Sequence, residues 1–380
     1  MSEKLYYRDA YISEFSATVL SVEQVGDRYA TVLDKTAFFP EEGGQYSDRG
    51  RLGAVNVLDV KEKDGEIIHY TDSALEVGAT VTGKIDFDER YEKMQCHTGE
   101  HILSGLFHSL FGLDNVGFHL GGEEVTMDIG APLSRAELDR VECLANEIIY
   151  KNVEITTEFP TPDELLSMEY RSKLDLTENV RIVRIGEYDA CACCAPHVKR
   201  TGEIGVIKIL EAVKLRGGMR IKIAAGRRAT RIFSELYDSA QKISELLSLK
   251  KSEIASGAQK LLSDYTALRA EYSAYRIKAM EERAVAHREA SGNSIVYFPD
   301  ATAEELIAYA NIATERVGGA LVLLTGSDGA YKYVISSASV DLRTKISDIN
   351  KSLLGRGGGK PNMVQGSFGA SYAEIEKYFS

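Results

Sequence analysis

Residues 90–112, "RYEKMQCHTGEHILSGLFHSLFG", mark the point at which the hydrophobic period of the chain changes from that of strands to that of a helix. The apolar residues of this stretch recur at helical spacing: Met94, Ile102, Leu103, Leu106 and Leu110. Gly112 is a typical residue at a helix end. We therefore predict one helix that begins near Glu89 and carries the two histidines of "HTGEH" one turn apart on the same face.

Upstream of this helix, residues 1–88 are predicted to form a small β-barrel. Short runs of alternating, β-branched residues, such as "RYATVLD" (28–34) and "ATVTGKIDF" (79–87), are separated by turn signals such as "KDGE" (63–66). Closing such strands into a barrel removes their exposed edges. A glycine-rich loop, "FFPEEGGQYSDRG" (38–50), interrupts the strands.

Two further domains of mixed pattern make the predicted fold class α+β. Residues 89–228 alternate between helical and strand patterns, and a second helix is expected to begin at Ser134, because Glu137 three residues later completes a capping box. Residues 292–380 follow a βαββα pattern, then a glycine loop and a last helix. That order predicts a small C-terminal α/β domain.

Between these domains, residues 229–291 are helical and highly charged. The stretch "LKKS" (249–252) suits a chain reversal with Ser252 as the next N-cap, so an antiparallel helical hairpin, or coiled coil, is expected. The second helix carries apolar residues at heptad spacing: Ile254, Ala258, Leu261, Tyr265, Leu268, Tyr272, Tyr275 and Ala279. Such a seam predicts packing and no chemistry.

The composition is that of a water-soluble chain in a reducing compartment. No apolar run approaches the roughly 20 residues that a membrane span needs, and the first residues show no signal-peptide pattern. Three of the five cysteines crowd into "CACC" (191–194), an arrangement that suits thiolates better than disulfides. We therefore expect a cytoplasmic protein.

The charge is unevenly distributed along the chain. The formal net charge is −12, which by itself argues against a nucleic-acid partner. Residues 199–231, however, hold ten Lys/Arg and two Glu, a local charge of +8. This stretch is a candidate to contact a phosphate backbone, and the alternative is an ordinary basic pair of strands.

"HTGEH" (97–101) also fits H-x-x-E-H, the pattern of the inverted zinc metalloproteases. Two imidazoles on one helix face are weak support for a metal, because a zinc site needs four ligands, or three and a water. "CACCAPH" (191–197) offers two more, since Cys193 and His197 repeat the same spacing. Together the four residues predict a Zn²⁺ site, although Cys193 can also be read as a small buried apolar residue.

Three motifs together resemble the editing domain of alanyl-tRNA synthetases and of the free-standing AlaX proteins: "TAFFPEEGGQYSDRG" (36–50), "HTGEH" and "CACCAPHVKRTGEIG" (191–205). "GRGGGKPNMVQG" (355–366) is similar to the C-terminal domain of that synthetase, which the DHH phosphoesterases share. The resemblance runs in order along nearly all of the chain. Because the aminoacylation part would have to precede residue 1, the arrangement matches the long AlaX form.

The resemblance implies hydrolysis of the ester between tRNA(Ala) and a wrong amino acid, chiefly serine and sometimes glycine. A pocket for alanine cannot strongly reject a residue that merely adds a hydroxyl, so a second, hydrolytic sieve is needed. The zinc ligands would be His97, His101, Cys193 and His197.

The loop motif adds substrate-binding candidates. Thr36 matches the threonine linked in this family to serine recognition, and Gln45 matches a glutamine that orients substrate or water. Gly43 and Gly44 allow a tight turn near the ligand.

The chemistry of the implied reaction leaves two roles open. The zinc ion either activates water and polarises the ester, or only anchors the substrate. Glu100 is a candidate general base, although a solvent-facing helix residue is the preferred interpretation. The family pattern C-G-G-T-H is replaced here by Cys193–His197 with Cys191 and Cys194 as extra thiols; Cys193 is retained as the ligand because it has the right spacing to His197.

The glycine loop "GRGGGKP" (355–361) is not a phosphate-binding P-loop, because Pro361 stands where a hydroxyl is needed. The resemblance ties the region to tRNA contact or to dimerisation, which would use Arg356, Gly357, Gly358, Gly359 and Lys360. The absence of an Asp-His-His triplet argues against a DHH phosphoesterase. Two alternatives remain: an H-x-x-E-H metalloprotease, and a zinc-containing tRNA-binding or dimerisation module without hydrolysis.

Overall fold

The computed structural model describes residues 2–122, 124–172 and 180–380, which form a mixed α+β structure, as the sequence predicts. The chain divides into two compact units, residues 1–242 and 243–380, and the division falls within helix α5 (Gly226–Leu247). Among the described residues, no helix has the length and apolar character required to cross a membrane.

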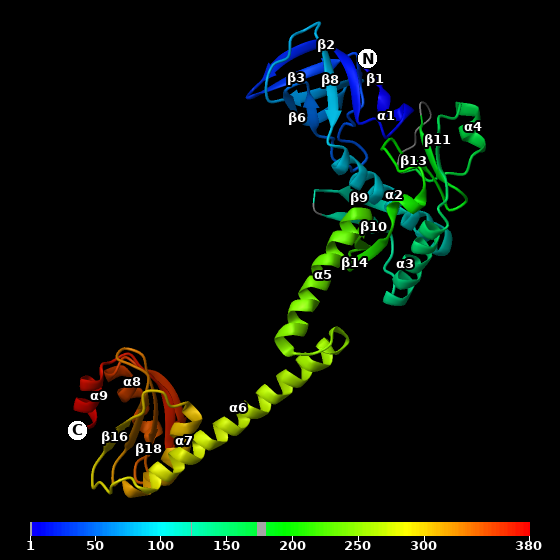
Figure 1. Ribbon diagram of the computed structural model, residues 1–380. Coiled ribbons are helices and arrows are strands. Elements are labelled where there is room, and N and C mark those ends of the chain that lie inside the picture. Colours follow the sequence, from blue (N-terminus) through cyan, green and yellow to red (C-terminus); the bar gives the residue numbers. More distant parts are fainter. Residues whose placement is uncertain (1, 123, 173–179) are drawn as a thin grey trace. The chain divides into compact units, whose positions relative to one another are not determined.

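Six strands of the first unit close into a barrel in the order β2-β3-β7-β6-β5-β8 (Figure 1). Their bounds are β2 (Glu14–Val25), β3 (Arg28–Leu33), β5 (Gly50–Leu52), β6 (Val55–Lys63), β7 (Glu66–Thr71) and β8 (Thr80–Ile85). The turn from β6 to β7 has positive φ at Asp64 and Gly65, as the "KDGE" signal requires. Beside the barrel, β1 (Glu3–Lys4) pairs in parallel with β4 (Lys35–Thr36), and α1 (Leu5–Arg8) follows β1.

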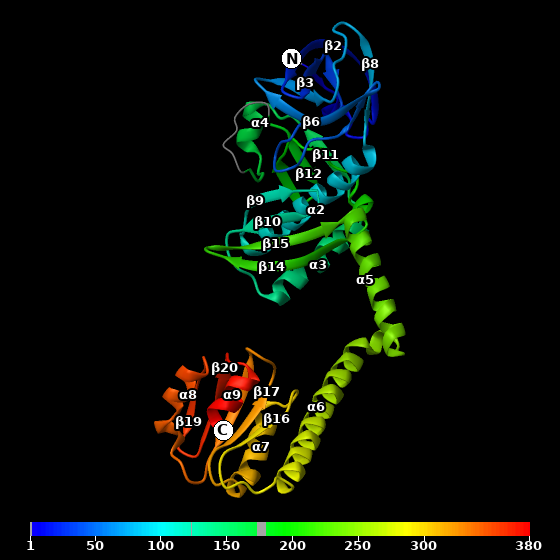
Figure 2. The same cartoon turned by 90° about the vertical axis from the view of Figure 1, so that its left-hand side faces the viewer.

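Helix α2 (Phe87–Phe111) leaves the barrel and runs through the main core of the first unit. It ends at Gly112, whose left-handed φ of 66° suits glycine. Helix α3 (Arg135–Tyr150) begins with the expected capping box of Ser134 and Glu137. Both helices pack against a four-stranded sheet: β14 (Ile207–Leu215), β15 (Gly218–Ala225), β10 (Val125–Ile129) and β9 (Asn115–Leu120), in that order (Figure 2).

A smaller antiparallel sheet carries the cysteine-rich segment. It consists of β11 (Ile155–Glu158), β12 (Ile182–Ile185) and β13 (Asp189–Ala192), and helix α4 (Pro162–Ser167) lies between β11 and β12 in the chain. Residues 193–200 follow β13 and lead into the 3-10 helix η1 (Thr201–Ile204).

Most cations of the basic stretch at 199–231 lie beside carboxylates, and contact of this stretch with a phosphate backbone stays a prediction. Seven of its ten cations form ion pairs: Lys199–Asp9, Lys208–Glu142, Arg220–Asp128, Lys222–Glu124, Arg227–Asp88, Arg228–Glu92 and Arg231–Glu92. The acidic partners come from distant parts of the sequence, so a local count of charge cannot reveal them.

The second unit contains the long helix α6 (Ile254–Val285), which begins after a 3-10 turn, η2 (Lys251–Glu253). The N-cap is Glu253, so the expectation that Ser252 caps this helix is wrong. The last turns of α6 pack through Met280 and Ala284 on helix α7 (Ala303–Ala313). Five seam residues are exposed: Leu261, Tyr265, Leu268, Tyr272 and Tyr275. The antiparallel hairpin stays a prediction.

The C-terminal sheet has the order β16-β17-β18-β20-β19 (Figure 1). Its strands are β16 (Ser294–Tyr297), β17 (Leu321–Thr325), β18 (Tyr331–Ser336), β20 (Met363–Phe368) and β19 (Arg356–Lys360), and helices α8 (Ile346–Ser352) and α9 (Tyr372–Phe379) complete the unit. The expected glycine loop is wrong, because residues 356–360 form the edge strand β19. A Cβ at Gly357 would lie 2.3 Å from the carbonyl oxygen of Gln365, so the glycines permit close strand pairing there.

Candidate active site

Four predicted metal ligands meet between helix α2 and the segment after β13. Because they are four residues apart, His97 and His101 lie on one face of α2, and Cys193 and His197 approach that face from residues almost 100 positions away. One donor atom from each of the four lies within 4.8 Å of the other three. All three imidazoles are buried. The geometry therefore groups Cys193, and neither Cys191 nor Cys194, with the three histidines.

Each histidine of this cluster has its Nδ1 atom engaged by a different side chain. His97 Nδ1 lies 2.8 Å from Gln45 Oε1, His197 Nδ1 lies 3.0 Å from Thr98 Oγ1, and His101 Nδ1 lies 3.1 Å from Asp189 Oδ2. These three oxygens can accept the Nδ1 proton, which leaves Nε2 of each ring as the basic nitrogen. The Sγ atom of Cys193 lies 3.6 Å from His97 Nε2 and 3.4 Å from His197 Nε2.

This donor set fits a zinc-type ion. Three imidazole nitrogens and one thiolate are ligands that zinc prefers, and ligating histidines typically give their second N–H to an oxygen acceptor. The protonation states agree with that use. Although burial opposes the thiolate, His97 and His197 hold the pKa of Cys193 well below its ordinary value. Burial instead raises the pKa of Cys191 and of Cys194, which keeps them as thiols.

The carboxylate of Asp189 is buried against two cations. Arg171 donates to it from Nε at 2.7 Å and from Nη2 at 3.0 Å, and His101 contacts Oδ2. Burial raises the pKa of Asp189, but His101 and Arg171 outweigh burial and hold the pKa below its ordinary value. Asp189 is therefore ionised and orients the His101 ring.

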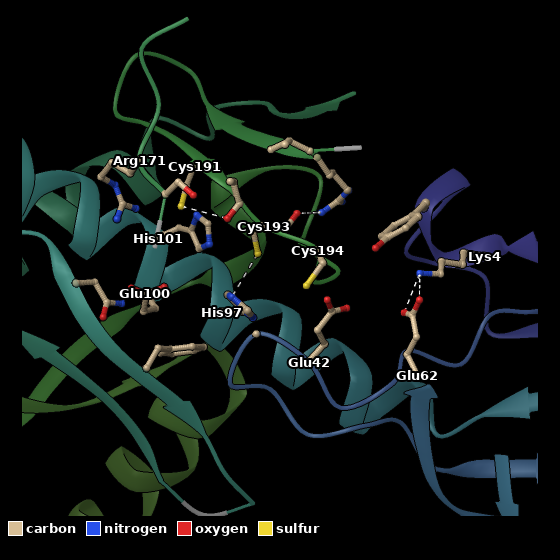
Figure 3. A pocket seen from close by; sticks show the side chains of 18 residues that line it. Lys4, Glu42, Glu62, His97, Glu100, His101, Arg171, Cys191, Cys193 and Cys194 are labelled. Atoms are coloured by element: carbon tan, nitrogen blue, oxygen red, sulfur yellow. Dashed lines mark hydrogen bonds and ion pairs between the residues drawn. The ribbon is translucent and has the colours of Figure 1, made fainter. Parts of the chain in front are cut away.

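The cluster borders a cavity of about 460 Å³ within the first unit (Figure 3). His97, His101 and Cys193 line it, together with Glu42, Gly43 and Cys194. Lys4 and Glu62 form an ion pair at 2.8 Å at the far end of the cavity from Glu100. A cavity of this size lies in the range of small-molecule binding sites, roughly 300–1,000 Å³.

Glu100 lines this cavity, which corrects its preferred interpretation as a solvent-facing residue. The side chain is 4% exposed. Its Oε1 atom accepts hydrogen bonds from Ser104 Oγ and Asn115 Nδ2. The packing of α2 against β9 buries this face of the helix, and the local sequence pattern does not reveal it. A buried, hydrogen-bonded carboxylate beside the cluster fits the alternative role of a general base.

The loop from β4 to β5 presents Gly43 to the same cavity and packs Gly44 against β9. Gly43 and Gly44 have φ of 63° and 80° and form the centre of a tight turn in which Glu42 and Gln45 exchange backbone hydrogen bonds of 3.2 and 3.0 Å. A Cβ at Gly44 would lie 2.4 Å from the Phe118 carbonyl oxygen. The glycines thus bring the loop onto β9 and place Gln45 beside His97.

Thr36 lies in the barrel interior and is absent from the cavity lining. Its Oγ1 atom is 2.8 Å from His69 Nε2 and accepts a hydrogen bond of 3.1 Å from the Phe38 N–H. His69 Nδ1 contacts the carbonyl oxygen of Thr31 at 3.1 Å. Because a carbonyl only accepts, His69 donates from Nδ1 and accepts the Thr36 hydroxyl proton at Nε2. The predicted contact between Thr36 and the substrate would have to open this network.

Several residues of the site carried no recognisable sequence signal. Arg171 and Asp189 precede the cysteine segment at spacings that match no known motif. Thr98 and Asn115 look like ordinary polar residues. The arginine that precedes β12, Arg181, also lines the cavity. Its position in the otherwise apolar stretch "VRIV" (180–183) is a sequence signal, because an arginine is rarely found among buried apolar residues.

Comparisons with known proteins relate this chain to tRNA synthetases and to an alanyl-tRNA editing protein. Residues 180–227 match the family described as threonyl and alanyl tRNA synthetase second additional domain, and residues 3–89 match class II (A) tRNA synthetases. The alanyl-tRNA editing protein AlaX-L of Pyrococcus horikoshii is 29% identical over 99% of this chain and 96% of its own length.

The chain spans about two fifths of the alanine–tRNA ligases that it matches. The ligase of Halorubrum lacusprofundi is 29% identical over 96% of this chain and 42% of its own length. The ligase of Halobacterium salinarum is 32% identical over 87% of this chain and 38% of its own length. Among solved structures, the C-Ala domain of Aquifex aeolicus alanyl-tRNA synthetase aligns with 23% of this chain and 85% of that domain, at 22% identity and a TM-score of 0.21. That TM-score is too low to carry a structural argument.

These matches make the chain similar to alanyl-tRNA synthetases and to the second additional domain of threonyl and alanyl tRNA synthetases. Along nearly the whole length of both chains, this chain is similar to an alanyl-tRNA editing protein of the AlaX-L type.

Proposed function

We propose that this protein is a zinc-dependent trans-editing hydrolase that removes a wrong amino acid, chiefly serine and also glycine, from tRNA(Ala). The observation that carries the proposal is the convergence of His97, His101, Cys193 and His197 at a cavity that also contains the buried carboxylate of Glu100. The family supplies the substrate class, because the matched relatives are named for alanyl-tRNA editing and alanine–tRNA ligation.

The metal would be held by the four residues of the cluster. A bound zinc ion supplies a positive charge that favours the developing oxyanion of the ester. Gln45, Thr98 and Asp189 hold the three imidazole rings with Nε2 directed inward, so the chain itself fixes the ligand geometry.

Glu100 is the residue that we assign as the base. Attack of water on the ester carbonyl releases a proton, and a carboxylate beside the cavity can accept it. Ser104 and Asn115 donate to one oxygen of Glu100 and leave the other available. The acyl group then leaves as a free amino acid, and the ribose oxygen of the tRNA recovers a proton.

The cluster disfavours the metalloprotease alternative. That alternative needs a glutamate as the third ligand and an open fourth position. Within the described residues, the donor set around His97 and His101 is completed by Cys193 and His197.

The proposed protein works in the cytoplasm and forms a homodimer. All five cysteines are free thiols, which fits the reducing cytoplasm. The exposed seam of α6 and the edge strand β19 are where we place the second copy of a homodimer, and β19 with Arg356 and Lys360 is the other candidate contact for tRNA. Light scattering that shows only a monomer would contradict the dimer.

The deciding experiment compares seryl-tRNA(Ala) with alanyl-tRNA(Ala) as substrates of the zinc-loaded chain. We expect hydrolysis of the seryl ester alone and its loss, together with loss of bound zinc, in Cys193→Ala. Cys194→Ala is the matched control, since its thiol stands outside the cluster, and it should keep both. Binding of tRNA without hydrolysis of either ester would favour the non-catalytic module.

A further inference from the structure

Arg181 is a buried arginine that has no carboxylate partner among the residues that the structure describes. Its side chain stands at the start of β12, and the residue is 7% exposed. The other fully buried arginines of the described chain have such partners, since Arg90 pairs with Asp48 and Arg228 pairs with Glu92. A buried charge is costly unless it is paired, so an unpaired guanidinium at this position requires an explanation.

The side-chain hydrogen bonds of Arg181 that the structure describes come from Nη1 of its guanidinium. Nη1 donates to the carbonyl oxygens of Cys193 and Ala195, both at 2.9 Å. Nε is buried and has no hydrogen-bond acceptor among the described residues. The Cζ atom lies 5.5 Å from the ring centroid of Tyr7. The group is thus held on one side and unsatisfied on the other.

Arg181 faces the cavity of the active site. The described part of its lining contains the cations Lys4, Arg171 and Arg181. Lys4 contacts both carboxylate oxygens of Glu62 at 2.8 Å, and Arg171 is bound to Asp189. Among the described lining residues, Arg181 is therefore the cation that can still accept an anionic partner.

We propose that Arg181 and Tyr7 form a phosphate subsite that binds the phosphodiester on the 5′ side of the terminal adenosine of the tRNA. This inference rests on the proposed function. An aminoacyl ester has no carboxylate of its own, and its amino group is cationic, so the nearest anion to the scissile bond is that phosphodiester. A guanidinium matches phosphate oxygens with its fork of N–H donors, and burial strengthens the pair.

The subsite explains how a small cavity can select a large substrate. Nη1 is already fixed by two carbonyl oxygens next to Cys193, so a phosphate on the remaining edge would set the distance between the ester and the metal ligands. Held in this way, the acyl group reaches Glu100 and the cluster in a defined orientation. Arg181 would act as a positioning residue and not as a catalytic one.

The test uses two small esters and the complete metal-loaded chain. One is the 3′-seryl ester of adenosine, and the other carries a methyl phosphodiester at the 5′ position. We expect kcat/KM to be about tenfold to a hundredfold higher for the phosphodiester compound, the effect of one charge-assisted hydrogen bond. Arg181→Met should bring the ratio close to one, and Arg181→Lys should restore part of it. Arg184→Met, three residues further along the chain in β12 and paired with Glu158 at the surface, should leave the ratio unchanged.

Full-length substrate provides a second readout that a purely structural role would not change. With seryl-tRNA, the plot of log kcat/KM against log salt concentration should flatten by about 0.7 in Arg181→Met, the value for one phosphate contact on a single strand. Zinc content measured on the same samples shows whether the loop at 193–195 is intact.

Three results would overturn the subsite. If the unaltered chain hydrolyses the two small esters with equal kcat/KM, the phosphate subsite is rejected and the proposed function is unaffected. A preference that survives replacement of the phosphodiester by a neutral methylphosphonate rejects it too, and this test needs no protein variant to fold. If the unaltered chain hydrolyses neither small ester nor seryl-tRNA, the proposed function and the subsite fail together.

Discussion

The Nδ1 atom of His101 lies 3.1 Å from the Oδ2 atom of Asp189, and both side chains are buried. The carboxylate fixes the ring of one predicted ligand from outside the cluster, and Arg171 on its other side keeps it ionised. Asp189→Asn should weaken zinc binding about 10- to 100-fold, because such outer partners orient the ligand and raise its basicity. Competition with a chromogenic chelator measures this affinity directly.

A surface histidine–aspartate pair serves as the control for this prediction. His108 and Asp114 have the same kind of contact, at 2.8 Å between Nδ1 and Oδ1, but both side chains are exposed. Asp114→Asn should leave the zinc affinity unchanged. An equal loss in both variants would mean that the change acts through general stability and not through the ring of His101.

The turn at Gly43 and Gly44 offers a matched pair of substitutions. Both residues have positive φ, so alanine costs about 1 kcal/mol of strain at either position. A Cβ at Gly44 would also lie 2.4 Å from the Phe118 carbonyl oxygen, whereas at Gly43 its nearest neighbour is Cys194 Sγ at 3.5 Å. Gly44→Ala should therefore lower thermal stability and activity far more than Gly43→Ala. Similar losses of stability and activity in the two variants would show that the positive φ, and not the contact with Phe118, determines the effect.

Glu100→Gln tests the general base. The amide keeps the size of the side chain and its hydrogen bond from Asn115, but it cannot take a proton from water. We expect kcat for seryl-tRNA to fall by on the order of 10²-fold or more, with KM and zinc content near those of the unaltered chain. A variant that keeps full activity would remove Glu100 from the mechanism and leave the charge of the metal as the main contributor.

Thr36→Val distinguishes a structural from a substrate-binding threonine. The hydroxyl donates to His69 and accepts from the Phe38 N–H, so valine leaves two buried polar groups unsatisfied. We expect about 2–4 kcal/mol of lost stability and a similar slowing of seryl- and glycyl-tRNA hydrolysis. A much greater loss for the seryl ester would instead support the role in serine recognition that the family resemblance implies.

The same network predicts a pH dependence of stability. Burial lowers the pKa of His69 from 6.5 to about 4, so the folded barrel keeps the ring neutral while the unfolded chain takes up a proton. Stability contributed by the neutral ring is complete above pH 6.5 and is lost as the pH falls towards 4. The loss at pH 5 relative to pH 8 is about 2 kcal/mol.

Urea unfolding at a series of pH values checks this prediction. His69→Gln should flatten the dependence between pH 6.5 and pH 4, and His119→Gln, which changes an exposed ring, should not. An unchanged slope in His69→Gln would assign the acid sensitivity to the metal ligands.

Features encoded within one element were predictable from the sequence by itself. The helix at 90–112 and its two histidines follow from spacing, the capping box of Ser134 and Glu137 from two residues, and the tight turn at Gly43 and Gly44 from glycine chemistry. The pairing of Cys193 with His197 is likewise a local spacing. Neighbours within an element lie at distances that the backbone geometry dictates, so a pattern is enough.

Only the tertiary structure decided what surrounds these residues. Because α2 packs on β9, Glu100 is buried and lines the cavity, although its position in the sequence suggested an exposed residue. Acidic residues from other segments form ion pairs with most cations of the basic stretch. Pairing with β20 made a strand of the glycine run at 356–360. Asp189 and Arg181 gained their roles in the same way. Contacts between residues far apart in the chain depend on how whole elements pack, and no local spacing records that.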